Sequence, residues 1–177
     1  MLDYFLIISE YFEHFSEFSK TYLYSHFETN LPDQATTSSG DFEKVKKFYA
    51  TCYEFYASAI TIFTCANNIK NDRKYNQLRN IDFKKYLESD KSKRKENFKE
   101  NEIFSNFSIE FDSTIRNASF HNWIRLNDDH TTIEFRSGGT GELQSMTYAE
   151  YLNKCSKLFF QICQLFKIEL ALTSNYS

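Results

Sequence analysis

The segment RNASFHN, Arg116 to Asn122, places a guanidinium, an amide and an imidazole close together in a chain that has only four histidines. Arginine can hold phosphate oxygens through its planar fork and stabilise the charge that develops on them. Histidine can move a proton near neutral pH, and RNA supplies its own nucleophile, the 2′-OH. These residue types allow two interpretations of the segment, a site that cleaves a phosphodiester or the end of an ordinary helix.

Spacing alone is a weak signal, because the segment RLNDDH, Arg125 to His130, has the same spacing. This second segment contains two acidic residues and is predicted to be a polar loop, where side chains are held poorly. Arg116 and His121 instead fall on a predicted helix. We therefore expect the first segment to carry the chemistry. The alternative is that Arg and His have no catalytic role and lie in the last turn of a helix, where the helix dipole stabilises cations.

Side-chain directions on that helix follow from a rotation of about 100° per residue. A core stripe is predicted at Phe104, Phe111, Ile115, Ala118, Ser119 and Asn122, and the opposite face carries Arg116, Asn117, Phe120 and His121. Asn117 and His121 are four residues apart, so the amide can bond the imidazole and help to set its tautomer. Asn117 is thus a supporting residue.

Arg116 and His121 diverge by about 140° on an ideal helix. They can meet only if the helix ends or distorts there, or if a second subunit completes the site. Phe120 is an aromatic residue on a face that should be wet, which makes it a candidate dimer contact.

The segment IRNASFHN resembles the signature of the HEPN superfamily, which has an arginine, a polar residue and a histidine after four to six intervening residues. The following NDDHTTIEF, a turn and MTYAEYLNKC resemble the continuation of such domains into their last helix, so the resemblance covers residues 104–165. It implies a dimer of helical bundles with two motif copies in one cleft, often a metal-independent endoribonuclease that acts as a toxin or antiviral effector. Arg116 and His121 would be the catalytic pair, with an antitoxin or another defence protein as a further partner.

The rest of the chain is consistent with helices, because it holds only four Gly and one Pro in 177 residues. Helices are predicted over residues 2–28, 41–63, 104–122 and 147–170; Asp41 caps the second, and Thr147 with Glu150 forms a capping box for the last. Residues 130–146 alternate on either side of a glycine-rich turn and predict a β-hairpin. The predicted fold is a single all-α domain over residues 1–177, an up-and-down bundle of four or five helices with a small hairpin before the last one.

Residues 67–100 carry eleven Lys and Arg against six Asp and Glu, although the whole chain has a net charge of −3. Residues 67–101 are expected to form a charged, mobile insert of loops or short exposed helical pieces. Such a basic zone can bind phosphate. The alternative is that it is a solvated surface segment with no binding role. The candidate RNA-binding residues are Lys91, Lys93, Arg94 and Lys95.

Cysteine placement predicts a reducing compartment and hence a cytoplasmic protein. Cys52 and Cys155 lie among apolar helical residues, and no C-x-x-C or Cys–His cluster predicts zinc. No metal site, no cofactor and no membrane span are expected. Two further functions stay open: a non-catalytic HEPN-like module that binds nucleotides, RNA or a protein, and a purely structural helical subunit.

Overall fold

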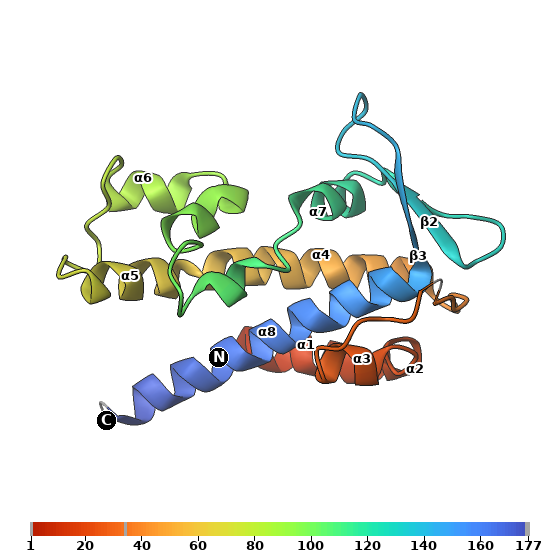
Figure 1. Ribbon diagram of the computed structural model, residues 1–177, viewed down its shortest axis with the longest axis horizontal. Helices are drawn as coiled ribbons and strands as arrows, with labels where there is room; N and C mark the ends of the chain where they lie inside the picture. The colour runs from red at the N-terminus through yellow and green to blue at the C-terminus, as the bar shows by residue number, and fades with distance from the viewer. Residues whose placement is uncertain (1, 34, 176–177) are drawn as a thin grey trace. The chain divides into compact units, whose positions relative to one another are not determined.

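Helices make up most of the part of the chain that the computed structural model describes, residues 2–33 and 35–175, and a small antiparallel sheet precedes the last helix (Figure 1). The chain divides into two units, one made of Met1–Tyr53 with Asp112–Ser177 and the other of Glu54–Phe111. The Arg116–His121 segment belongs to the first unit. The charged segment 67–101 belongs to the second.

The first unit is built around the long helix α8, Tyr148–Asn175 (blue in Figure 1), which α1, α2 and α3 contact. The other elements of this unit are α1 (Leu2–Glu13), α2 (Phe15–Phe18), α3 (Tyr22–His26), the start of α4 (Phe42–Ala59), α7 (Ser113–Phe120), β1 (Ile124–Leu126), β2 (Thr132–Phe135) and β3 (Gln144–Thr147).

Stacked aromatic rings fill the core of this unit. The Tyr11 ring lies between Phe159, at 3.8 Å between centroids, and Phe18, at 4.5 Å, and both pairs are nearly parallel. The Tyr11 hydroxyl meets that of Ser156 at 3.2 Å, so its polar tip is satisfied inside the core. Burial raises the pKa of Tyr11 to about 12.

The single N-terminal helix predicted over residues 2–28 is wrong, because the segment forms the three pieces α1, α2 and α3. The core face of α1 consists of Tyr4, Ile7 and Tyr11, whereas Phe5 and Phe12 are more than half exposed. Both stripes have helical spacing, so in a segment this rich in aromatic residues periodicity does not choose between adjacent faces.

The predicted hairpin is confirmed as β2 and β3, which pair antiparallel with Ile133 opposite Met146. A third strand, β1, was not predicted; it pairs with β2 on the other side. The predicted capping box is also confirmed. The Thr147 backbone N–H donates to Glu150 Oε2 at 2.7 Å, and the Glu150 N–H donates to Thr147 Oγ1 at 3.1 Å.

The second unit contains the end of α4 and mostly short helices. They are α5 (Thr61–Lys70), α6 (Phe83–Glu88) and the 3₁₀ helices η1 (Lys91–Asn97) and η2 (Ser105–Ser108). The prediction of short helical pieces in residues 67–101 is confirmed. Their predicted exposure is wrong at Tyr86, Arg94 and Phe98, which are buried in this unit.

The predicted fold class is therefore confirmed at the coarse level of a helical protein with a strand insert before its last helix. The helices of the described residues are more numerous than the four or five expected, and most are shorter, although α8 is longer than the helix predicted over 147–170. The predicted cap of the second helix is present, since Asp41 Oδ1 accepts from the Lys44 N–H at 3.4 Å.

Candidate functional site

Helix α7 carries the candidate site and is shorter than predicted. A continuous helix over residues 104–122 is wrong, because the chain leaves η2 and starts again at Asp112. Asp112 Oδ1 accepts from the backbone N–H groups of Thr114 and Ile115, at 3.0 and 3.2 Å, and so caps the new helix. The core stripe predicted on it is confirmed for Ile115 and Ala118, both fully buried.

The end of α7 determines the position of His121. Asn122 has a φ of 54°, and the Trp123 N–H donates to the Ala118 carbonyl at 2.9 Å. These features form a Schellman motif, in which a residue in the left-handed conformation closes the helix. His121 is therefore the C-cap residue, and Asn122 lies beyond the helix on the surface instead of on the core stripe.

Arg116 is held by its own helix. Its Nη1 donates to Asn117 Oδ1 at 2.8 Å, and its Cζ lies 4.9 Å from the centroid of the Phe120 ring. A second aromatic ring, that of Tyr53, has its centroid 6.0 Å from the same atom. These contacts fix the guanidinium on a platform of aromatic rings, where cation–π attraction orients it.

His121 is exposed, and its ring faces Trp123 with 5.0 Å between centroids. The amide oxygen of Asn117 accepts from Arg116 and not from the imidazole, so the predicted Asn117–His121 bond is wrong. A hydrogen bond from a charged guanidinium is stronger than one from a neutral ring, which favours this partner for the amide oxygen. On the other side, Lys46 Nζ donates to Asn122 Oδ1 at 3.2 Å, which adds a cation beside the end of α7.

Within one chain, α7 thus presents two separate groups. The guanidinium lies on Phe120, and the imidazole lies on Trp123 one residue past the helix. Phe120 itself keeps half of its surface exposed, as a dimer contact would require before association. No contact of the described residues joins the side chains of Arg116 and His121.

The competing segment is occupied by a structural ion pair. Arg125 lies on β1 instead of in the predicted loop, and its Nε and Nη2 donate to Glu134 Oε2 on β2 at 2.9 and 2.6 Å. The ion pair with its cross-strand partner Glu134 thus gives Arg125 a structural role. His130 is an exposed turn residue with a φ of 57°.

The four candidate RNA-binding residues do not form one basic surface. Arg94 is buried and donates to the carbonyls of Ala57 and Leu87, at 3.1 and 2.6 Å, so its assignment to RNA is wrong. Lys91 pairs with Glu54 at 2.9 Å, and Lys95 donates to the Phe111 carbonyl at 3.2 Å. Lys91, Arg94 and Lys95 thus satisfy acceptors of their own unit. Lys93 is exposed.

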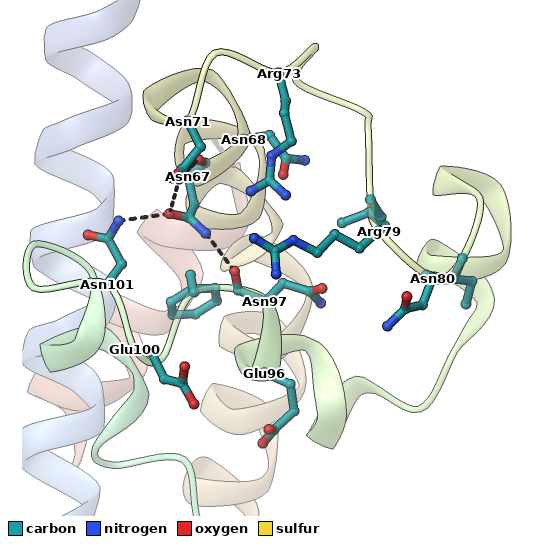
Figure 2. Close-up of a pocket in the computed structure, with 13 residues that line it drawn as sticks. Asn67, Asn68, Asn71, Arg73, Arg79, Asn80, Glu96, Asn97, Glu100 and Asn101 are labelled. Carbon is teal, nitrogen blue, oxygen red and sulfur yellow. Dashed lines mark hydrogen bonds between the residues drawn. The ribbon is translucent and has the colours of Figure 1, made fainter.

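A cavity that the sequence reasoning missed lies elsewhere in the second unit, lined by asparagines of α5 and by Arg73 and Arg79 of the following loop (Figure 2). The available signal was an excess of asparagine in NNIKNDRKYNQLRN, residues 67–80. The segment was interpreted only by its charge.

The described residues contain neither a metal-binding cluster nor a membrane-spanning helix. No group of three or more His, Cys, Asp or Glu there could hold a metal ion. All four cysteines are free, and burial raises the pKa of the Cys52 and Cys155 thiols well above the ordinary value. Among residues 2–33 and 35–175, no helix combines the length and the apolar character that crossing a bilayer requires.

Comparisons of the chain with protein-family models, with curated proteins and with solved structures found no match.

Proposed function

We propose that the protein is a metal-independent endoribonuclease of the HEPN type, with Arg116 and His121 as its catalytic residues. The observation that carries this proposal is the end of α7: the Schellman closure at Asn122 leaves His121 exposed as the C-cap, directly after a helix whose Arg116 is already oriented by Asn117 and Phe120. A helix end of this kind provides an exposed imidazole and a half-buried planar cation.

The chemistry would proceed by attack of an RNA 2′-oxygen on the adjacent phosphorus. His121 takes the 2′-OH proton or delivers a proton to the leaving 5′-oxygen, while the P–O5′ bond breaks. Arg116 holds the non-bridging oxygens and stabilises the charge of the transition state. The products are a 2′,3′-cyclic phosphate and a 5′-OH, and the step needs no metal or cofactor.

A second copy of the chain completes the site in this proposal. Within one chain the imidazole turns to Trp123 and the guanidinium rests on Phe120, so a catalytic pair would combine groups from both copies in a cleft. The exposed half of Phe120 offers an apolar contact for such a homodimer. The bundle would then be of the up-and-down type of these domains, and the protein a cytoplasmic toxin or antiviral effector with an antitoxin or defence-system partner.

RNA cleavage by the purified protein in EDTA tests the proposal. We expect the wild type to release 2′,3′-cyclic phosphate ends and His121→Ala to lose activity by about 10²- to 10⁴-fold. His130→Ala is the matched control, because it removes an exposed histidine of the same unit and should cleave as the wild type does. If the wild type and His121→Ala cleave RNA equally, or if a stable wild-type dimer cleaves no RNA, His121 is not the catalytic residue.

A further inference from the structure

The cavity of the second unit has a volume of about 420 Å³, within the range of small-molecule sites. Every residue that lines it lies between positions 67 and 101. Figure 2 shows the side chains of α5, of the loop after it and of η1 arranged around this space. The site is therefore built entirely within one unit of the chain.

One wall of the cavity is a fixed network of amides. Asn67 is its centre: its Nδ2 donates to the Asn97 carbonyl at 2.7 Å, and its Oδ1 accepts from Asn101 at 2.7 Å and from Asn71 at 3.1 Å (Figure 2). Asn68 is buried and donates to the Tyr75 carbonyl at 2.9 Å, which ties down the loop that carries the arginines. This wall is rigid before any ligand enters.

Two arginines face the cavity without an acceptor. Figure 2 shows the guanidinium groups of Arg73 and Arg79 turned toward the same space. Neither guanidinium makes a hydrogen bond or an ion pair with the described part of the chain. The Nε of half-buried Arg73 is itself buried without an acceptor, whereas Arg79 is exposed. A buried donor with no acceptor is costly, and this cost falls on Arg73. The exposed guanidinium of Arg79 adds a second positive charge facing the same space.

The acidic residues of the lining do not relieve this charge. Glu96 forms an ion pair with Lys99 at 2.5 Å. In Figure 2 the carboxylates of Glu96 and Glu100 point away from the two guanidinium groups. An anion from solution that offers several oxygens, as phosphate does to an arginine fork, would give Arg73 its acceptor and pair with Arg79 at the same time.

We propose that this cavity binds a small phosphate-bearing molecule of nucleotide size, with its phosphate between Arg73 and Arg79. The volume exceeds what a phosphate group alone would fill, and Leu78 and Ile81 supply apolar lining for an organic part. Asn80 supplies an amide that bonds no described residue, and an asparagine amide can pair with the edge of a base. The site stands apart from the proposed ribonuclease function and does not rest on it.

Calorimetric titration of the full-length protein with AMP, with inorganic phosphate and with adenosine tests this site. AMP should bind, phosphate should bind more weakly at the same place, and adenosine should not bind detectably. Arg79→Gln and Arg73→Gln should each weaken AMP by about 10- to 100-fold, since each removes a charge-assisted contact. Lys84→Gln is the matched control, because it removes one exposed charge of the same unit away from the cavity, and Arg116→Gln reports on any phosphate bound at α7.

Several results would overturn the proposal. The proposal fails if neither AMP nor phosphate binds, or if AMP binding survives in both arginine variants. It also fails if Lys84→Gln loses AMP binding as strongly as the arginine variants do. A short RNA strand that binds through these arginines while AMP does not would overturn it as well. Thermal unfolding without ligand separates binding from folding. Because Arg73 has no partner for its buried Nε, Arg73→Gln should unfold at the wild-type temperature or above, whereas a structural arginine would lower that temperature.

Discussion

Arg116 and Phe120 are four residues apart on α7, and the guanidinium carbon lies 4.9 Å from the centroid of the half-exposed ring. The ring therefore contacts the cation while half of its surface stays exposed. In the proposed dimer, the orientation of Arg116 and the contact with the second copy would both depend on Phe120.

Phe120→Ala should weaken self-association by about tenfold or more, because exposed aromatic residues in the centre of an interface dominate binding energy. Sedimentation equilibrium measures the change. Phe27→Ala is the control, as it removes a ring that is 67% exposed elsewhere on the same unit. A wild-type protein that stays monomeric at all concentrations would contradict the dimer.

Asn117 is a positioning residue for Arg116, since its Oδ1 accepts from Nη1 at 2.8 Å. Asn117→Ala should lower kcat for RNA by about 10- to 150-fold, which corresponds to one hydrogen bond to a charged group. Asn117→Asp keeps the acceptor oxygen and should retain most of the activity. Equal losses in both variants would show that the amide does more than hold the arginine.

Asn122 should tolerate glycine but not valine. Its φ of 54° suits Gly and Asn, whereas a β-branched residue is strained in this region. Asn122→Val should cost about 1–2 kcal/mol in the free energy of unfolding and displace His121, with loss of cleavage. Asn122→Gly should change stability by less than about 1 kcal/mol and keep the activity. Urea denaturation and the EDTA cleavage assay measure the two effects.

Tyr11 should make the fold sensitive to alkali. Burial raises its pKa from 10.0 to about 12 in the folded state, so the unfolded chain releases this proton first as pH rises. The stabilising contribution is complete below pH 10 and is lost between pH 10 and 12.

Tyr11→Phe should therefore flatten the decline of unfolding free energy over this pH range, as measured by denaturant titrations at several pH values. At pH 7 the variant should lose about 1 kcal/mol, because the buried Ser156 hydroxyl loses its partner. Tyr75→Phe, at a ring that is 55% exposed, is the control. An unchanged alkaline slope in Tyr11→Phe would contradict the role of this group.

Local chemistry accounts for what the sequence could predict. The Thr147–Glu150 capping box, the Asp41 cap and the glycine-rich hairpin turn all depend on residues a few positions apart, and each is present. The break before α7 had a comparable signal in Asp112, whose carboxylate competes with helix continuation. That signal was outweighed by the apparent stripe from Phe104 to Phe111.

What the sequence could not predict depends on contacts over long separations. The choice of Tyr4, Ile7 and Tyr11 as the buried face of α1 is made by rings of α8, about 150 residues away. The charged segment predicted Arg94 to lie on the surface. In the structure it is an interior residue that donates to the carbonyls of Ala57 and Leu87. The charge of a segment does not reveal which of its cations already have acceptors.

Thr147 ends the last strand and caps α8 with no connecting residue, and the Tyr148 N–H donates to the Thr131 carbonyl at 2.7 Å, next to the start of β2. The sheet and the last helix are thus joined directly, with no loop between them. A displacement of the hairpin would therefore also displace the first turn of α8.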